Sequence, residues 1–323
     1  MEALPEFRLH RPATLDEALA AAQEDPGARF VAGGTDLIVN MRRGLVETSA
    51  LIDVNGVAEM QDIVADGGTL TIGAAVTLDD LAKDETVARD FPAVAQAAAE
   101  VAGSTHRNVA TVGGNLCLDT RCIFYNQSQW WRESNDYCLK YRGEICHVAP
   151  KSERCFALFS GDLAPALLVH GAAVSVAGPD GAREMPLADL YRGDGADYLT
   201  LAPGEIVTGV TVPKSEMRSA YRKARVRGSI DFPLAGVAVA LRMQGGRIAN
   251  LHAALTACDT KPFAVGKLDA FLAKPADEDT AQAFGEIVQQ QARPMRTTMS
   301  TPWYRRRVVA RLARRLLLEL GAS

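Results

Sequence analysis

The sequence lacks a long apolar segment, a signal peptide and an excess of positive charge. No apolar run of about 18 residues occurs in it, and the first residues, MEALPEFRLHRP, contain no apolar signal core. We therefore expect a soluble, cytoplasmic chain with no membrane span. The formal net charge of −4 argues against nucleic acid as the main partner, because neutralising phosphates requires a basic surface.

The cysteines lack the short C-x2-C pairs of common structural zinc sites and ferredoxins, yet they are clustered. Five of the six lie between Cys117 and Cys155, and from Cys122 the spacing is C-x15-C-x7-C-x8-C. A reducing cytosol makes disulfides unfavourable and favours metal binding by clustered thiols. The polar and aromatic residues between them cannot form a core, so four thiolates around a metal centre would order the segment. Spacing alone leaves zinc and an iron–sulfur cluster open.

Two of the glycine pairs outside the cysteine segment have surroundings that suit a bound ligand. The first pair, Gly33-Gly34, joins a predicted strand at residues 29–32 to a predicted helix from Leu37. The second pair, Gly113-Gly114, follows polar residues 104–108. Neither is the six-residue dinucleotide fingerprint or a P-loop. Two such loops in one unit suit a diphosphate contacted from two sides, so we expect a dinucleotide cofactor.

Together these motifs carry a family resemblance. The segments 32–37 and 107–116 resemble the paired flavin loops of the FAD-binding medium subunits of the xanthine dehydrogenase (molybdenum hydroxylase) family. The resemblance continues through residues 160–168 and 203–207, through Lys223-x3-Arg227-x3-Asp231, and through Ser300, Trp303, Tyr304 and Arg305. It covers essentially the whole chain, with the motifs in the family's order.

The resemblance implies an α+β fold with a two-part FAD-binding domain and a C-terminal α+β domain that has a small antiparallel sheet and helices. The expected boundaries are 1–57 for the first FAD-binding subdomain, 58–214 for the second and 215–323 for the C-terminal domain. It also implies an FAD site to which both glycine loops and three later residues contribute. The implied FAD-binding residues are Phe30, Val31, Ala32, Gly33, Gly34, Thr35, Asp36, Leu37, Val101, Ala102, Ala110, Thr111, Gly113, Gly114, Asn115, Asp162, Val207 and Lys223.

The chain departs from ordinary members by an insertion of about 40 residues at about 118–158, which separates the second glycine loop from Asp162. A flavin subunit with such an insertion resembles the beta subunits of 4-hydroxybenzoyl-CoA reductases, whose inserted loop holds a [4Fe-4S] cluster. The resemblance implies that the ligands are Cys122, Cys138, Cys146 and Cys155. Cys117 is left out, and His147 is an alternative ligand.

By the same resemblance, the chain contributes to anaerobic degradation of aromatic compounds. Electrons would pass from a ferredoxin-type donor through [4Fe-4S] and FAD to the [2Fe-2S] clusters of a small subunit. They would then reach the molybdopterin cofactor of a large subunit, for reductive dehydroxylation of 4-hydroxybenzoyl-CoA to benzoyl-CoA. The complex would be a dimer of heterotrimers, and this chain itself would have no proton-transfer residue to assign.

Two other functions remain open. The chain can be the flavin subunit of another molybdenum hydroxylase that uses NAD or oxygen, with structural zinc at the cysteines. It can also be a flavin-binding assembly subunit without turnover of its own.

The insertion is also rich in aromatic and basic residues. Trp130, Trp131, Tyr137 and Tyr141 could shield a cluster from solvent. Five basic residues could present a cationic face to an acidic donor, although charged runs are more often simply solvated. These five are Arg121, Arg132, Lys140, Arg142 and Lys151.

Outside the insertion, Cys258 lies in an apolar stretch and is expected to be a core thiol. We predict strands at residues 169–176, 198–201, 206–212, 232–243 and 247–258. A last amphipathic helix is predicted at residues 304–320, with its arginines opposite an apolar face.

Overall fold

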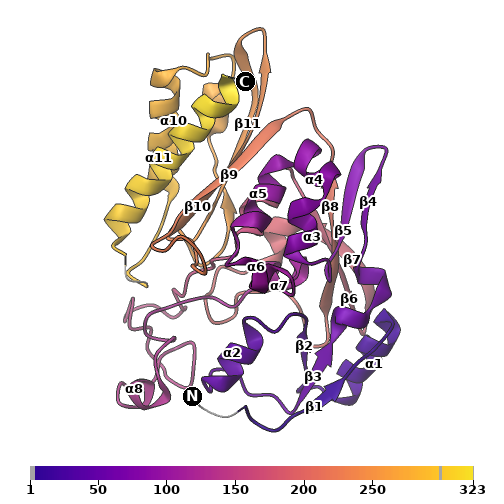
Figure 1. Cartoon of the computed structure of the whole chain (residues 1–323). Coiled ribbons are helices and arrows are strands. Elements are labelled where there is room, and N and C mark those ends of the chain that lie inside the picture. Colours follow the sequence, from indigo (N-terminus) through magenta and orange to yellow (C-terminus); the bar gives the residue numbers. More distant parts are fainter. Residues whose placement is uncertain (1–3, 298–299, 323) are drawn as a thin grey trace.

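The structure is a computed structural model that describes residues 4–297 and 300–322 as three β-sheets with their covering helices (Figure 1). In the view of Figure 1 the N-terminal sheet lies at the bottom, the second sheet at the right, and the C-terminal helices at the upper left. The predicted α+β class is confirmed.

The N-terminal sheet is parallel, with the order β1-β3-β2. Its strands are β1 (Arg8–His10), β3 (Ala50–Asp53) and β2 (Arg29–Val31). Parallel strands need crossover connections, which α1 (Leu15–Glu24) and α2 (Leu37–Arg42) provide. Thr14 caps the first of these helices, because its side chain accepts a hydrogen bond from the Glu17 N–H at 3.2 Å.

The second sheet is antiparallel, with the order β4-β5-β8-β6-β7. Its strands are β4 (Ile63–Asp66), β5 (Thr69–Gly73), β8 (Ile206–Pro213), β6 (Ala173–Gly178) and β7 (Gly181–Pro186). The associated helices are α3 (Leu78–Lys83), α4 (Glu85–Asp90), α5 (Pro92–Glu100), α6 (Ser104–Arg107), α7 (Val112–Leu116) and α9 (Leu163–Leu168). The alanine-rich α5 is buried, with Ala93, Ala97 and Ala98 fully inaccessible to solvent.

The C-terminal sheet is antiparallel, with the order β12-β11-β10-β9. Its strands are β12 (Phe263–Ala264), β11 (Arg247–Thr256), β10 (Ala235–Gln244) and β9 (Arg218–Ala224), and the long helices α10 (Glu278–Gln291) and α11 (Pro302–Gly321) cover it. Cys258 is fully buried in this core, so the predicted core thiol is confirmed. Within residues 4–297 and 300–322, none of the helices combines the length and apolar character that a bilayer crossing requires.

Short helices complete the fold. The insertion contains one helical turn, α8 (Gln129–Glu133). The 3-10 turns are η1 (Val54–Gly56), η2 (Ala58–Met60), η3 (Leu187–Leu190) and η4 (Leu268–Phe271).

One large apolar core connects the three sheets, since it contains Ile52 of β3, Ile72 of β5 and Tyr221 of β9. Helix α5 makes the connection between the second and third sheets. The Ala93 N–H donates to Ser219 Oγ at 3.2 Å, and the Tyr221 N–H donates to Gln96 Oε1 at 2.9 Å. This contact fixes β9 against the helices that precede the second glycine loop.

Several predicted elements were wrong at their ends or entirely. Residues 198–201 form no strand but only an isolated bridge between Leu199 and Tyr191. The strand predicted from residue 169 begins at Ala173, because residues 169–172 follow the end of α9. Strand β9 was not predicted at all. Its polar side chains have partners on α5 and at the site described below, so the segment lacks the alternating apolar pattern that indicates a strand. Strand β10 starts after Phe232 and Pro233, since proline cannot donate to the ladder.

His170 is a buried, titratable core residue. Its side chain is 4% exposed, Nε2 lies 3.1 Å from Ser219 Oγ, and the ring packs edge-on against Phe91. Burial, aided by the nearby His252, lowers the pKa of His170 to about 4 from 6.5. The unfolded chain therefore binds this proton more readily, and stability is lost as pH falls from 6.5 towards 4.

We expect this histidine to make the protein acid-sensitive. The gap between the two pKa values corresponds to about 3 kcal/mol of unfolding free energy, lost by about pH 4. His170→Gln should retain the bond to Ser219 and remove that part of the loss. Urea unfolding midpoints at pH 7 and pH 4.5 measure the difference, and equal pH dependence in both proteins would contradict the assignment.

Candidate functional site

The two glycine loops, residues 30–37 and residues 104–116, are in direct backbone contact. A Cβ added to Gly33 would lie 2.0 Å from the Val109 carbonyl oxygen and 2.8 Å from the Ala110 nitrogen. Only a residue without a side chain allows this approach. The structure therefore brings together two segments that are more than seventy positions apart in the sequence.

The first glycine loop presents backbone N–H groups. Gly34 has a φ of 66°, a left-handed conformation that favours glycine. Among the described residues, the N–H groups of Gly34 and Thr35 donate to no protein acceptor. Successive unpaired N–H groups in such a turn form a concave anion-binding surface, which fits a diphosphate. Phe30 and Val31 on β2, Ala32 directly after it and Leu37 at the start of α2 flank this turn.

The second glycine loop is held by its own hydrogen bonds. Thr111 caps α7 by accepting from the Gly114 N–H at 3.2 Å. The Gly113 N–H donates to the Ala74 carbonyl at 2.8 Å, and a Cβ at Gly113 would lie 2.9 Å from the Ala74 Cβ. Asn115 Oδ1 accepts from the Leu163 N–H at 3.0 Å. The loop is thus fixed on one side to β5 and on the other to the start of α9.

Asp162 and Lys223 form a buried ion pair beside this loop. Their side chains are 4% and 1% exposed, with Lys223 Nζ 3.1 Å from Asp162 Oδ1. Tyr221 donates its hydroxyl to Asp162 Oδ1 at 2.6 Å. Burial raises the pKa of Asp162, while the Lys223 ammonium and the Tyr221 hydroxyl act in the opposite direction. The sequence reasoning missed Tyr221, although its place two residues before Lys223 on one strand puts both side chains on the same face.

Val101 and Ala102 follow α5 and contact the second glycine loop, because Arg107 Nη1 donates to the Val101 carbonyl at 3.0 Å. Ala102 has a φ of 44°, which is unusual for a residue with a Cβ. Its carbonyl accepts from the Ile230 N–H at 3.1 Å and from Ser229 Oγ at 3.2 Å. These bonds place the β9–β10 loop, residues 225–234, next to Ala102. Strain of this kind persists only where the surroundings impose it, and it often marks ligand sites.

Val207 is a predicted site residue that lies in the apolar core. It is 3% exposed and belongs to the main apolar core on β8. Its neighbour Thr208 accepts, through its carbonyl, from the Ala74 N–H at 2.9 Å. Val207 therefore supports the floor beneath the second glycine loop.

The insertion, residues 118–158, closes on itself beside the first glycine loop. Near the two ends of the insertion, Arg121 and Leu158 exchange backbone hydrogen bonds of 2.7 and 2.8 Å. Arg121 forms an ion pair with Asp36 of the first glycine loop, and its guanidinium lies 4.8 Å from the Phe232 ring centroid. The insertion is thus attached to the predicted flavin site by a charged contact.

All four predicted cysteine ligands are buried within the insertion. Cys122, Cys138, Cys146 and Cys155 are 7%, 8%, 4% and 5% exposed. A hydrogen bond with Cys155 lowers the pKa of Cys146 to about 5, and burial raises the pKa of Cys122 to about 11. Cys117 packs instead against the main core. In the described part of the chain, no three His, Cys, Asp or Glu side chains are arranged to hold a single metal ion.

The alternative ligand His147 makes other contacts. Its Nε2 is bonded to the Tyr137 carbonyl, and its ring lies 5.3 Å from that of Phe124. The aromatic shield is only partly as expected. Trp130 is 73% exposed, whereas Trp131 packs on Phe124 with ring centroids 6.2 Å apart.

The expectation of a cationic docking face on the insertion was largely wrong. Arg132 is 1% exposed and donates to the Arg43 and Gly44 carbonyls at 3.1 and 3.3 Å. Lys140 is buried, and Arg121 pairs with Asp36. Arg142 contacts Glu47 at 2.5 Å and remains half-exposed, while Lys151 is exposed. Most of these cations hold the insertion in place and do not face solvent.

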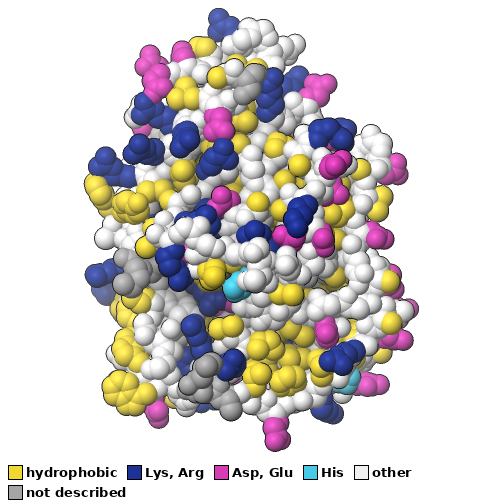
Figure 2. All heavy atoms as spheres, in the orientation of Figure 1, with side chains coloured by type: hydrophobic (Ala, Val, Ile, Leu, Met, Phe, Trp, Pro, Cys, Tyr) yellow, Lys and Arg dark blue, Asp and Glu magenta, His cyan; other side chains and the backbone are white. Residues whose placement is uncertain are grey.

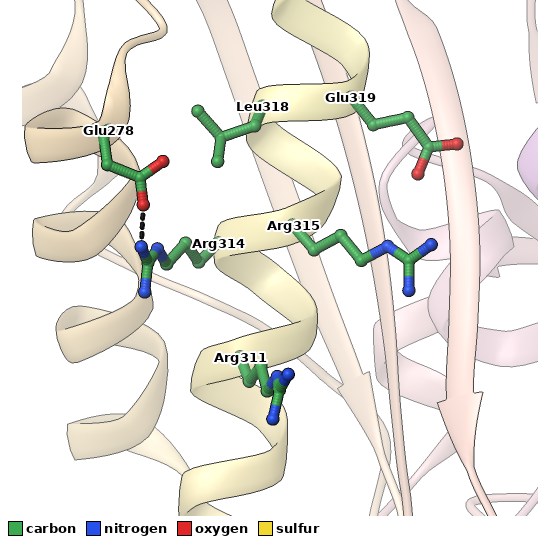
Figure 3. A pocket seen from close by; sticks show the side chains of 6 residues that line it. All are labelled: Glu278, Arg311, Arg314, Arg315, Leu318 and Glu319. Atoms are coloured by element: carbon green, nitrogen blue, oxygen red, sulfur yellow. Dashed lines mark ion pairs between the residues drawn. The ribbon is translucent and has the colours of Figure 1, made fainter.

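Two surface hollows of the described structure lie on the C-terminal helices, away from the glycine loops. Figure 2 shows Lys and Arg side chains gathered at the upper left, over α10 and α11. In the hollow between these helices, Glu278 reaches across to Arg314, and none of the predicted FAD-binding residues lines it (Figure 3). It is a charged, open surface and not a flavin site.

Comparison with known proteins gives matches over nearly the whole chain. Residues 5–215 match the FAD binding domain in molybdopterin dehydrogenase, and residues 219–320 match the CO dehydrogenase flavoprotein C-terminal domain. The chain is 36% identical over 287 residues to the aldehyde oxidoreductase FAD-binding subunit PaoB of Escherichia coli (strain K12). That match covers 85% of this chain and 88% of the relative.

Two further matches cover more of the chain. It is 26% identical over 321 residues to the carbon monoxide dehydrogenase medium chain of Hydrogenophaga pseudoflava, covering 97% of this chain and 96% of that one. Its structure is similar to a chain of quinoline 2-oxidoreductase from Pseudomonas putida 86, with a TM-score of 0.80 and 25% identity. That superposition covers 99% of this chain and 98% of the other.

Proposed function

Because the chain belongs to the family of FAD-binding medium subunits of the molybdenum hydroxylases, we propose that it carries electrons between FAD and a [4Fe-4S] cluster for a molybdenum enzyme. It is an oxidoreductase subunit of that family. The observation that supports the proposal best is the attachment of the cysteine insertion to the first glycine loop through Arg121 and Asp36.

The residues that would hold FAD are those of the two glycine loops with Val101, Ala102, Asp162, Val207 and Lys223. The N–H groups of Gly34 and Thr35 fit a diphosphate. Gly33 and Gly113 allow the close backbone contacts that set the two loops against each other. Lys223 and Asp162 keep a charged, hydrogen-bonding wall in place. Bound FAD supplies the redox chemistry, while these residues bind and orient it.

Cys122, Cys138, Cys146 and Cys155 would hold the [4Fe-4S] cluster. The four thiols are buried together in one segment, and Cys138 and Cys146 act electrostatically on Cys122. Four thiols suit either structural zinc or an iron–sulfur cluster. We favour the cluster because a flavin subunit belongs to an electron-transfer chain, to which redox-inactive zinc would add nothing.

The partners would be a large subunit with a molybdopterin cofactor and a small subunit with [2Fe-2S] clusters, assembled as a dimer of heterotrimers in the cytoplasm. A ferredoxin-type carrier would exchange electrons with the [4Fe-4S] cluster. The family membership supports the two subunits. The insertion with its proposed cluster supports a separate point at which single electrons enter or leave this subunit.

Two substrates of the whole complex are candidates. The cysteine insertion led us to reductive dehydroxylation of 4-hydroxybenzoyl-CoA. The 36% identity to an aldehyde oxidoreductase subunit favours oxidation of an aldehyde as the second candidate. Steady-state assays of the purified complex decide between them. Reduction of 4-hydroxybenzoyl-CoA by a reduced one-electron dye supports the first, and dye reduction by aldehydes alone excludes it.

The cluster is tested by metal analysis of the purified complex and two cysteine variants. We expect Cys146→Ser to lose about four irons per heterotrimer together with the matching electron paramagnetic resonance signal. Cys117→Ser should keep both, because Cys117 packs on the main core and not with the four buried cysteines of the insertion. Zinc without this iron in the wild-type complex would overturn the cluster assignment, and iron loss in Cys117→Ser would show the ligand set to be wrong.

A further inference from the structure

Lys140 is a buried cation with every donor engaged. Its side chain is 5% exposed. Nζ donates to Asp119 Oδ1 at 2.8 Å, to Thr120 Oγ1 at 2.7 Å and to the Gly195 carbonyl at 2.6 Å. An ammonium group has three donors, so this set satisfies it completely. A lysine buried in this way keeps one position and is not available to an external partner.

The same hydrogen bonds place this charge beside the cysteines. Lys140 follows Cys138 by two residues in the turn that returns to Tyr141. Gly195, whose carbonyl accepts from Lys140, donates its N–H to the Cys155 carbonyl at 2.9 Å. Lys140 is therefore linked to two of the four proposed ligands, once through the chain and once through Gly195.

The other groups that face Lys140 are one carboxylate and two phenol rings. The rings of Tyr125 and Tyr198 lie 4.9 and 5.2 Å from Nζ. Asp119 offsets part of the positive charge, but its second oxygen accepts from the Tyr125 hydroxyl at 3.2 Å. Its backbone also lies at the start of the insertion, away from the turn that carries Lys140 in the sequence. Of this ion pair, the Lys140 ammonium and not the Asp119 carboxylate is therefore the group attached to the cysteine segment.

The ammonium of Lys140 lies inside the insertion and not at its surface, since its side chain is only 5% exposed. Solvent does not screen a charge at this depth as it screens one at the surface.

We propose that Lys140 is a positioning residue that holds a fixed positive charge beside the four-cysteine site and raises the reduction potential of the cluster bound there. This inference rests on the proposed function of the four cysteines. Each reduction adds one electron, and so one negative charge, to the cluster. A nearby buried cation stabilises that added charge, and net charge and hydrogen bonding around a cluster set its potential.

The exposed Arg142 provides a matched control in the same turn. It is 51% exposed and paired with Glu47 at 2.5 Å. Both residues carry one positive charge near Cys138, but only Lys140 is buried. If variants at the two positions change the reduction potential by different amounts, the difference therefore comes from the burial of the charge. It does not come from the number of residues between the charge and a ligand.

The test is a redox titration of the purified complex with dithionite, followed by electron paramagnetic resonance. Lys140→Met should shift the oxidation–reduction equilibrium of the cluster about tenfold against the reduced form, which is about 59 mV for one electron. Lys140→Arg should stay close to the wild type, and Arg142→Met should shift the equilibrium less than about twofold. The flavin content should not change in any of the three.

Two outcomes separate this inference from the function on which it rests. A Lys140→Met complex with full iron content and an unchanged potential overturns the role of Lys140 alone. Absence of a [4Fe-4S] signal in the wild-type complex overturns the proposed function itself. If Lys140→Met fails to assemble because Asp119 is left unpaired, the double variant Asp119→Asn/Lys140→Met is titrated instead. A smaller shift in the same direction is expected there, and no shift counts against the proposal.

Discussion

Gly33→Ala is expected to remove FAD from the protein and to destabilise it by about 3 kcal/mol or more. The added methyl group would lie 2.0 Å from the Val109 carbonyl oxygen and 2.4 Å from its carbon. No side-chain rotation relieves this contact, because both groups belong to the backbone. The two glycine loops must separate, and the concave surface proposed for the diphosphate is lost.

The flavin-to-protein ratio of the purified complex, read from its visible absorbance, measures this loss. Gly68→Ala is the matched control, because a Cβ there meets no atom within 4 Å and the residue lies in the β4–β5 turn. We expect Gly68→Ala to keep full flavin and an unchanged unfolding midpoint. Full flavin content in Gly33→Ala would show that the contact between the loops is not needed for binding.

Asp162→Ala is expected to reduce the free energy of unfolding by about 3–5 kcal/mol, because it leaves the Lys223 ammonium buried and unpaired. The side chain of Lys223 is 1% exposed and cannot reach water without a change in the fold. The Tyr221 hydroxyl loses its acceptor as well. Urea unfolding of the purified protein measures the change. Lys83→Met, which breaks an exposed pair with Asp79, should cost less than about 1 kcal/mol.

The double variant Asp162→Asn/Lys223→Met separates stability from flavin binding. Removing both charges should recover most of the lost stability, since a buried pair often contributes little net free energy. Flavin content should stay low, because both residues belong to the proposed FAD wall. A double variant that is stable and fully loaded with flavin would mean that the pair only supports the fold.

Local sequence patterns predicted the elements whose structure depends on neighbouring residues. The strand–glycine turn–helix unit around Gly33 and the last amphipathic helix were predicted, because turns and periodic faces are short-range features. The strand predicted at residues 198–201 was wrong for the opposite reason. Its apolar residues pack on the core without a neighbouring strand to pair with.

The positions of the charged residues in the insertion could not be predicted from the sequence. Arg121, Arg132 and Lys140 read as a solvated or docking face, since lysine and arginine are usually exposed. In the structure they are buried or half-buried because their partners come from distant segments. Those partners are Asp36, the carbonyls of residues 43–44, and Asp119 together with the Gly195 carbonyl. No local pattern connects such residues.

The family, the flavin, the two glycine loops and the four clustered cysteines could all be predicted from the sequence, because each depends on residue type and order along the chain. The folded chain was needed to show that the loops touch at Gly33 and that Asp162 pairs with Lys223 and Tyr221. It was also needed to show that the insertion is attached to the first loop through Arg121 and that Lys140 lies buried beside the cysteines. These features depend on contacts between residues far apart in the sequence, which form only when the three sheets pack together.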